Sequence, residues 1–144
     1  MPRTAILMYH NIAEPPRGVR LRNLYVTPAM FRFQMWYLRA AGFKVVTLDQ
    51  MREFATGRFH QSGIDKMVAL TFDDGFTDFY GNAYPVLRQY GYPATVYLVS
   101  EYIGGMNYWD AEKLQAEKPL MDWDMIGELH KNGITFGSHT RTHP

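Results

Sequence analysis

The sequence predicts an α/β fold in which parallel strands alternate with helices. Short apolar runs are separated by segments whose apolar residues recur at helical spacing, and this alternation is typical of parallel strands joined by right-handed crossovers. A histidine or a pair of adjacent aspartates follows three of these runs within two residues, at the strand ends where α/β proteins tend to keep their chemistry. The alternation leaves two architectures open, a barrel-like sheet and an open, doubly wound sheet.

Five strands are expected, each from a short apolar run bounded by polar or turn residues. They cover residues 5–9, 44–47, 67–72, 94–99 and 134–137. The run at 67–72 is the central, buried strand, and the run at 94–99 is rich in the β-branched residues that strands favour. The first strand ends at His10.

Four helices are expected between the strands. They cover residues 28–41, 49–55, 78–90 and 122–131. Thr27 caps the first helix, and Pro28 occupies its first position, where the missing N–H of proline is harmless. Asp49 lies near the cap of the second helix, and Pro85 interrupts the third.

Loops are expected where polar, proline and glycine residues gather. They cover residues 14–22, 56–66 and 100–120. Helices are expected to end at Gly42, Gly91 and Asn132-Gly133. The segment 100–120 is long for a loop inside a compact domain, and loops of this length are often functional.

Composition excludes several classes of protein. The formal net charge is +1 and the basic residues form no run, so nothing favours binding to nucleic acid or to an anionic membrane. No apolar run approaches the ~20 residues of a membrane-spanning helix. The apolar part of the N-terminus is too short for a signal peptide, which predicts either a cytoplasmic protein or one whose export signal has been removed. Because the sequence has no cysteine, any metal must be held by histidine, aspartate or glutamate.

Two adjacent acids, Asp73 and Asp74, follow the central strand. An ionised carboxylate near a core is costly unless it is paired or binds a metal. Neighbouring side chains on a strand point to opposite faces, so both acids reach one site only if the strand ends there and the backbone turns. Gly75 permits such a turn. The alternative interpretation is an Asp-Asp-Gly turn on the surface.

Two histidines follow the last strand, at the same edge of the predicted sheet as the acids and His10. His139 and His143 are four residues apart, so one helical turn would point both the same way. Pro144 disfavours helical geometry at His143, and we therefore expect a single turn that breaks. Two histidines with a carboxylate form a metal site with open positions. The alternative is a solvated or core-packed histidine pair.

Two multi-residue motifs, in this order, resemble those of a known family. Thr71-Phe72-Asp73-Asp74-Gly75 is similar to the first motif of the polysaccharide deacetylases (the NodB homology domain, carbohydrate esterase family four). His139-Thr140-Arg141-Thr142-His143-Pro144 resembles their second motif, H-[ST]-x-x-H-P. Met8-Tyr9-His10 at the end of the first strand and Trp123-Asp124 at the last helix also look like members of this family.

The resemblance implies a fold, a metal and a reaction. The fold is the family's deformed (β/α) barrel, here a partial one. The metal is divalent, usually zinc, held by Asp74, His139 and His143, with Asp73 as the general base. The reaction is hydrolysis of N-acetyl groups on N-acetylglucosamine polymers, or of acetylated xylan in some members, with release of acetate. A metal with three protein ligands can lower the pKa of its bound water to roughly 7 and polarise a carbonyl, which suits this reaction.

The sequence departs from the family pattern at its C-terminal end. The family continues after the second motif with an arginine motif, an aspartate–tryptophan motif and a Leu-x-His motif that carries the general acid. Five strands are also too few to close the family's barrel. We therefore expect residues 1–144 to be the N-terminal part of a single deacetylase-like domain in a longer natural protein, with an open sheet edge that invites self-association. The alternative is a non-catalytic carbohydrate-binding or scaffold remnant.

Three further residues are candidates for binding the carbohydrate. His10 either lines the pocket or is a hydrogen-bonded residue at a strand end. Tyr108 and Trp109 offer broad apolar faces with a polar edge, which suit stacking on sugar rings; core packing is the alternative. Arg141 is expected to face solvent or a neighbouring acid. A two-histidine-one-carboxylate iron(II) oxygenase shares the ligand set, but the α/β alternation argues against the antiparallel scaffold of that class.

Overall fold

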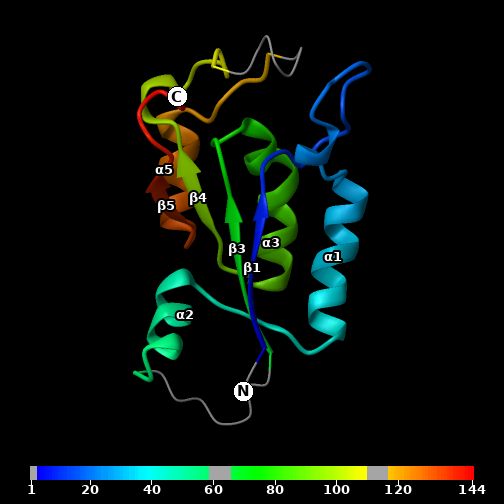
Figure 1. The fold of residues 1–144 in the computed structure, drawn as a ribbon, viewed down its shortest axis with the longest axis vertical. Helices are drawn as coiled ribbons and strands as arrows, with labels where there is room; N and C mark the ends of the chain where they lie inside the picture. The colour runs from blue at the N-terminus through cyan, green and yellow to red at the C-terminus, as the bar shows by residue number, and fades with distance from the viewer. Residues whose placement is uncertain (1–2, 59–65, 110–116) are drawn as a thin grey trace.

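A computed structural model describes residues 3–58, 66–109 and 117–144 of the chain. Strands and helices alternate along these ranges (Figure 1). The elements are β1 (Arg3–Tyr9), η1 (Arg22–Leu24), α1 (Pro28–Ala40), β2 (Lys44–Val45), α2 (Leu48–Ala55), β3 (Lys66–Phe72), η2 (Phe79–Ala83), α3 (Tyr84–Tyr90), β4 (Thr95–Leu98), η3 (Ser100–Tyr102), α5 (Trp123–Lys131) and β5 (Thr135–Ser138). Among the described helices none is long and apolar enough to cross a bilayer.

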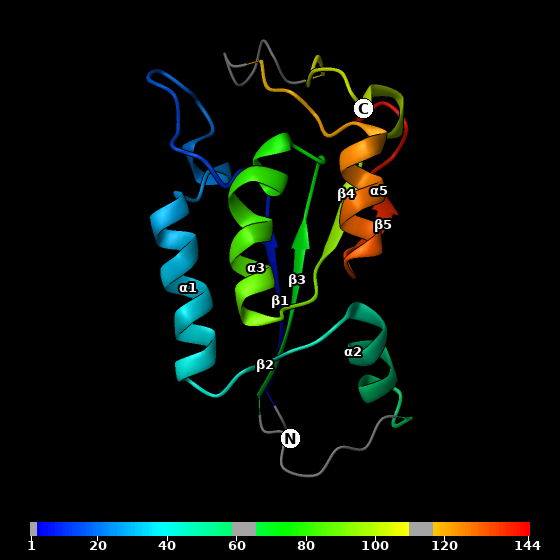
Figure 2. The same cartoon turned by 180° about the vertical axis from the view of Figure 1, so that it is seen from behind.

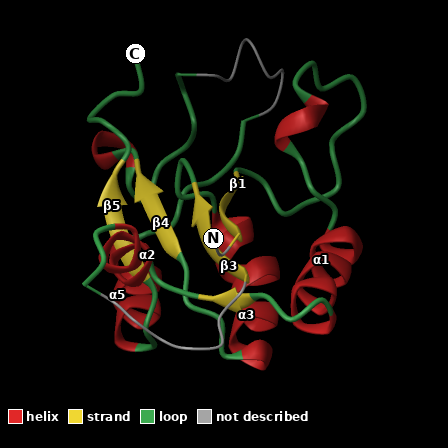
Figure 3. Cartoon of the chain, turned by 60° about the horizontal axis from the view of Figure 1, so that its bottom comes forward, coloured by secondary structure: helices red, strands yellow, loops and turns green. Residues whose placement is uncertain are grey.

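The strands form one parallel sheet, as the alternation predicted. The order is β1-β3-β4-β5, with β2 alongside the first part of β3. β1 pairs with β3 along its whole length, from Arg3 opposite Lys66 to Tyr9 opposite Phe72. Figure 3 shows the strands in a curved row with α1, α3 and α5 outside it, which agrees with a partial barrel. Because all strands run the same way, their C-terminal ends lie at one edge of the sheet.

The main core lies between the sheet and the helices α1 and α3, which cover the same face of it (Figures 1 and 2). Phe72 of β3 stacks on Tyr9 of β1, with ring centroids 5.1 Å apart. The rings of Phe31 in α1 and Phe79 in η2 meet Phe72 edge-on at 5.9 and 4.7 Å. Fully burying a phenylalanine contributes roughly 1.5–3 kcal/mol, so this aromatic cluster holds the two strands firmly against the helices.

The start of the first helix and the residues that end three helices are as predicted. Thr27 accepts a hydrogen bond from Met30 N at 3.2 Å, and Pro28 is the first residue of α1. Gly42, Gly91 and Gly133, which follow α1, α3 and α5, all adopt a positive φ. These ends are predictable because a threonine is a preferred N-cap and a glycine readily adopts the positive φ that ends a helix.

The junction between the second strand and the second helix differs from the prediction. The second strand ends at Val45, because Thr47 belongs to the next helix as its N-cap. Thr47 Oγ1 accepts from Gln50 N at 3.1 Å and Gln50 Oε1 accepts from Thr47 N at 3.0 Å. This reciprocal capping box makes Thr47 the N-cap of α2, with Asp49 in the first turn, near the cap as predicted. Residues 59–65 of the predicted loop 56–66 lie outside the described ranges.

The helix predicted at 78–90 changes type along its length. Phe79–Ala83 form a wider π turn, and the α-helix begins at Tyr84. Pro85 therefore lies in the first turn of α3, where a missing N–H leaves no hydrogen bond unmade. The predicted interruption is real, and its physical form is the switch from π to α geometry.

Loops and turns gather at the C-terminal edge of the sheet, at the top of Figure 1. The segment 117–121, which we call the strap, crosses the turn after β3 by an antiparallel bridge between Phe76 and Leu120. Thr77 N donates to Pro119 O at 3.0 Å, and Met121 N donates to Gly75 O at 2.9 Å. The strap therefore fixes the backbone that follows the two acids.

Candidate metal centre

The turn after β3 brings both acids to the C-terminal edge of the sheet. Asp73 N still donates to Tyr9 O at 2.9 Å, and the chain then turns at Asp74 and Gly75, whose φ values are 73° and 77°. A positive φ, as at Asp74, is uncommon for a residue other than glycine, and such residues are found most often at functional sites. A Cβ on Gly75 would lie 2.6 Å from Leu98 Cδ2, so the close approach to β4 also requires glycine. Asp73 and Asp74 are only 8% and 5% exposed.

The tail after β5 is held beside the segment that follows β4. Three backbone hydrogen bonds, from His139 N to Leu98 O at 2.8 Å, Ser100 N to Thr140 O at 3.3 Å and Glu101 N to Arg141 O at 3.0 Å, continue the pairing of these strands. Arg141 forms an ion pair with Glu101, so the prediction that it faces solvent or a neighbouring acid is confirmed. This anchoring delivers both histidines to the edge where the acids lie.

The two histidines lie on either side of a bend and not on the single broken turn that was expected, although the predicted departure from helical geometry at His143 is present. Thr140 and His143 adopt φ values of 65° and 56°, which a right-handed helix cannot contain. Thr140 Oγ1 accepts a hydrogen bond from His143 N at 3.0 Å and closes a bend in place of the turn. The bend still brings the two imidazole rings together, with centroids 5.0 Å apart.

Three side chains converge on one point. His139 Nε2 and His143 Nε2 lie 3.6 and 3.4 Å from Asp74 Oδ1. The potential ligand atoms of these three residues all lie within 4.8 Å of one another. Asp74 Oδ1 is buried and has no hydrogen-bond partner among the described residues. A buried carboxylate oxygen that faces two imidazole nitrogens is the arrangement a divalent cation needs.

The electrostatics of Asp74 agree with a cation site. Burial raises the pKa of the Asp74 carboxyl and the neighbouring Asp73 adds to the rise, whereas His10, His143 and His139 oppose it. A cation bound beside the carboxylate would favour its ionised form much more strongly than these histidines do. Two imidazoles and one carboxylate, with no cysteine in the chain, form a nitrogen and oxygen donor set that fits a metal such as zinc.

Asp73 and His10 lie beside this group of three. Their closest side-chain atoms, His10 Nε2 and Asp73 Oδ2, are 4.0 Å apart. His10 follows β1 and Asp73 follows β3, so the pairing of these two strands places them together. Asp73 is not one of the three residues whose ligand atoms cluster, which leaves its carboxylate available for another task.

The two aromatic candidates of the long loop lie differently. The ring of Trp109 stacks on that of His143, with centroids 5.2 Å apart and an interplanar angle of 29°. Tyr108 is 59% exposed and meets Tyr102 edge-on at 6.0 Å. Residues 110–116 of the predicted loop lie outside the described ranges.

A buried polar network near the site was not anticipated from the sequence. Lys118 of the strap forms an ion pair with Asp78 and donates to Asn11 Oδ1 at 2.5 Å. Its ammonium group also lies 5.0 Å from the ring centroids of both Tyr25 and Phe76. Neither Lys118 nor its partners belong to a motif, and their spacing along the chain gives no signal of contact.

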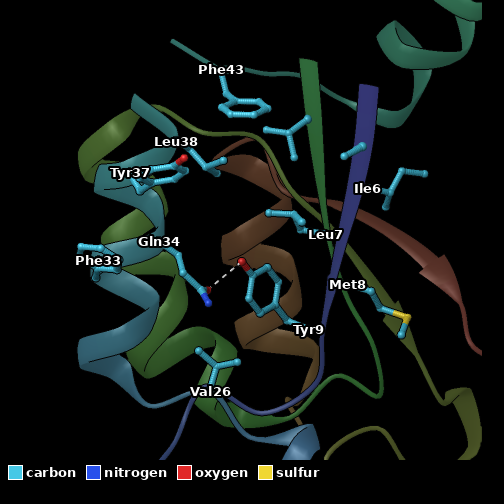
Figure 4. Close-up of a pocket in the computed structure, with 12 residues that line it drawn as sticks. Ile6, Leu7, Met8, Tyr9, Val26, Phe33, Gln34, Tyr37, Leu38 and Phe43 are labelled. Atoms are coloured by element: carbon cyan, nitrogen blue, oxygen red, sulfur yellow. Dashed lines mark hydrogen bonds between the residues drawn. The ribbon is translucent and has the colours of Figure 1, made fainter. Parts of the chain in front are cut away.

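One cavity of the described residues lies away from the candidate metal centre. It has a volume of about 550 Å³ and lies between β1 and α1, where apolar side chains line it (Figure 4). None of Asp74, His139 and His143 lines it. The candidate metal centre therefore lies at the edge of the sheet, whereas this cavity lies on its helix-covered face.

Comparisons with known proteins place the chain in a family. Residues 60–144 match the family model described as polysaccharide deacetylase, and the chain belongs to this family. The family is metal-dependent in general, and the chain carries an aspartate and two histidines able to hold a metal. The resemblance stated from the two motifs is thus confirmed.

Individual relatives agree. The chain is 32% identical to the YxkH protein of Bacillus subtilis over 96% of its own length and 42% of that protein. It is 30% identical to the poly-beta-1,6-N-acetyl-D-glucosamine N-deacetylase of Staphylococcus epidermidis, over 83% of this chain and 38% of the relative. The chain therefore spans about two-fifths of the length of these curated relatives.

Solved structures show the same fold. The structure of IcaB from Ammonifex degensii superposes with a TM-score of 0.80 at 25% identity, covering 98% of this chain and 54% of IcaB. A polysaccharide deacetylase from Bacillus cereus superposes with a TM-score of 0.73 at 26% identity, covering 99% of this chain and 40% of that one. These neighbours support the partial (β/α) barrel of the predicted fold class.

Proposed function

We propose that this chain is the metal-binding part of a hydrolase that removes N-acetyl groups from an N-acetylglucosamine-type polymer or oligosaccharide and releases acetate. The observation that carries the proposal is the convergence of Asp74, His139 and His143 from two distant motifs. Membership of the polysaccharide deacetylase family supports the reaction. The name of the Staphylococcus epidermidis relative, a poly-beta-1,6-N-acetyl-D-glucosamine N-deacetylase, supports the class of substrate.

In this proposal Asp74, His139 and His143 hold a divalent cation, and zinc fits their donor set best. When bound, the cation supplies Lewis-acid polarisation of the acetamide carbonyl and lowers the pKa of a water to roughly 7. Asp73 lies beside the ligands and acts as general base, accepting a proton from the water that attacks the carbonyl carbon. Cleavage of the carbon–nitrogen bond then gives acetate and a free amine on the sugar.

The proposal also assigns residues to the carbohydrate. His10, 4.0 Å from Asp73, lies where it can hydrogen-bond to a group next to the base. Tyr108 is exposed and Trp109 is half-buried at the edge of the metal centre, and aromatic faces of this kind suit the apolar face of a sugar ring.

A second copy of the chain is the proposed partner at the free edge of β1. Among the described residues β1 pairs only with β3. Figure 4 shows Leu7 and Tyr9 pointing toward α1 and Ile6 and Met8 on the other side of the strand. Ile6 and Met8 are 55% and 62% exposed, and an open edge with exposed apolar side chains favours association.

Metal content and acetate release test the proposed function together. The purified chain should hold about one zinc ion, and His139→Ala should lose it, because a carboxylate and one imidazole bind zinc weakly. The matched control is His130→Ala, which removes an exposed histidine at the end of α5. Equal zinc content in wild type and His139→Ala would contradict the ligand set.

Acetate release from N-acetylglucosamine oligomers is measured on the same preparations. Release that depends on the bound metal supports the hydrolase. A chain that binds metal and the oligomers but releases no acetate supports the alternative, a non-catalytic carbohydrate-binding module.

A further inference from the structure

Four rings form a continuous column that ends at the proposed metal ligands. Tyr102 lies 5.4 Å from Trp109, Trp109 lies 5.2 Å from His143, and His143 lies 5.0 Å from His139, all between ring centroids. The contact between Trp109 and His143 is the flattest of the three, with 29° between the ring planes. One face of the His143 imidazole is therefore covered by an indole.

Few other contacts fix the orientation of the His143 ring. The backbone of His143 has a positive φ of 56° in an exposed bend, and among the described residues its backbone N–H donates one hydrogen bond, to Thr140 Oγ1. A metal-binding histidine usually donates its second ring N–H to a carboxylate or carbonyl, which fixes the orientation of the ring. Within residues 3–58, 66–109 and 117–144, no hydrogen bond to the rings of His139 or His143 is found.

Packing, and not hydrogen bonding, also places Trp109. Its Nε1 is buried and has no hydrogen-bond partner among the described residues. A tryptophan in a loop ordinarily keeps its N–H toward water or an acceptor. The indole N–H is instead buried, and the indole ring contacts the rings of Tyr102 and His143, so these two ring contacts determine its place.

We propose that Trp109 is a positioning residue that holds the His143 imidazole in its ligand orientation by ring stacking, in the role that a hydrogen bond usually has. This inference rests on the proposed metal site and gives Trp109 a task that does not require carbohydrate. A flat aromatic face restricts rotation of the imidazole, whereas an aliphatic side chain of similar size fills the space without fixing the ring plane.

The inference predicts a specific order of metal affinities. Trp109→Leu should weaken zinc binding about 10- to 100-fold, the range typical for loss of an outer contact to a metal ligand. Trp109→Phe keeps a ring face and should stay within about threefold of wild type. Zinc affinity is measured by competition with a chromophoric chelator, and the symmetry of the site by the visible spectrum of bound Co²⁺. Trp36→Leu, at an indole 52% exposed on α1, is the matched control.

The outcomes separate this inference from the proposed function. A wild-type chain that binds no metal contradicts the metal site itself. A wild-type chain that binds zinc while Trp109→Leu binds it equally well overturns the positioning role and leaves the metal site standing. Weakening by Leu with recovery by Phe supports the role, and equal weakening by both substitutions overturns it.

A second measurement does not depend on the Leu variant folding. Trp36 and Trp123 are 52% and 69% exposed, so replacing both by Phe leaves Trp109 as the sole tryptophan in a chain with an intact site. Binding of Co²⁺ should quench the emission of Trp109 strongly, because its ring lies against a ligand. Emission that is unchanged at saturating Co²⁺ would show that the indole does not cover His143.

Discussion

The two adjacent aspartates have different surroundings although they differ little in burial. Asp74 turns its Oδ1 toward two imidazoles from a strained, positive-φ backbone, whereas Asp73 keeps an extended backbone bond to Tyr9 and faces His10. Since a strand presents neighbouring side chains to opposite sides, the turn at Asp74 is what brings both acids to one edge of the sheet, where Asp74 faces the histidine pair and Asp73 faces His10. Isosteric substitutions at the two positions should therefore have different effects.

Asp73→Asn should keep metal content near that of wild type and reduce acetate release by about 10²- to 10⁴-fold, because it removes the proposed base and leaves the proposed ligands. Asp74→Asn should lose the metal. The two variants have the same chemical change one residue apart, so each serves as the control for the other. Acetate release by Asp73→Asn at the wild-type rate would exclude Asp73 as the base.

Tyr9 gives the chain a predictable response to alkaline pH. Burial raises the pKa of the Tyr9 phenol to about 12, and its hydroxyl donates to Gln34 Oε1 at 3.0 Å. The unfolded chain ionises this group near pH 10, so the stability it contributes is present below pH 10 and is lost as the pH rises toward 12. The loss amounts to about 2–3 kcal/mol.

Tyr9→Phe should remove this part of the alkaline loss. Urea unfolding at pH 8 and at pH 11 measures it, and the stability difference between the two pH values should shrink in the variant. The exposed Tyr37→Phe is the control for deletion of a hydroxyl on the same side of the molecule. An equal alkaline loss in Tyr9→Phe and wild type would contradict the assignment.

The convergence of Asp74, His139 and His143 could be predicted because each motif is local. Asp73, Asp74 and Gly75 are consecutive, and His139 and His143 are separated by three residues, so spacing alone places each group at a strand end. The bend at Thr140 could not be predicted, since a threonine hydroxyl competes with helical geometry only in a particular backbone conformation. The stacking of Trp109 on His143 depends on the path of a long loop, which no periodicity encodes.

At the scale of elements, the strap joins the loop after β1 to the turn after β3. Lys118 reaches Asp78 at the start of η2 and Asn11 in the loop, and Asp78 Oδ1 accepts from Ile12 N at 3.2 Å. The side chains of Lys118 and Asp78 are 15% and 9% exposed, so this ion pair is largely shielded from water. Breaking a buried pair by removing one partner is strongly destabilising because the other charge remains.

Lys118→Met should destabilise the fold by about 3–5 kcal/mol, and the double variant Lys118→Met/Asp78→Asn should recover a large part of the loss. Urea unfolding measures both. The control is Arg52→Met. The side chains of Arg52 and Asp49, which form an ion pair, are 72% and 77% exposed, so losing this pair should change the free energy of unfolding little. A Lys118→Met variant as stable as Arg52→Met would show that the network does not hold the strap.

Element types could be predicted well and element ends less well. The strands were predictable because buried parallel strands are short apolar runs. The start of α1 was predictable from Thr27 and Pro28, and the end of α5 from Asn132-Gly133. The sequence allows Thr47 to be either the last residue of a strand or the N-cap of a helix. The hydrogen bond that the Gln50 side chain accepts from Thr47 N decides for the N-cap. The π turn at 79–83 depends on packing that local propensity does not describe.

At the scale of the whole molecule, the free edge of β1 predicts dependence on concentration. If two copies pair along β1, sedimentation velocity should show a shift to a larger species as the concentration of the chain rises. Met8→Lys places a charge on the exposed side of the edge strand and should abolish the shift, because inward or edge lysines oppose strand pairing. The control is Met30→Lys, at a methionine 50% exposed on α1. A single monomeric species at all concentrations would exclude the dimer.

The parallel pairing of β1 with β3 also has a consequence for biosynthesis. Arg3 pairs with Lys66, so β1 leaves the ribosome about sixty residues before its neighbour exists. At roughly 5–20 residues per second, the strand waits for several seconds with both edges open. During that interval the apolar side chains of β1, including Ile6 and Met8, have no sheet to pack in. We therefore expect a nascent chain of this fold to bind a chaperone that shields short apolar segments.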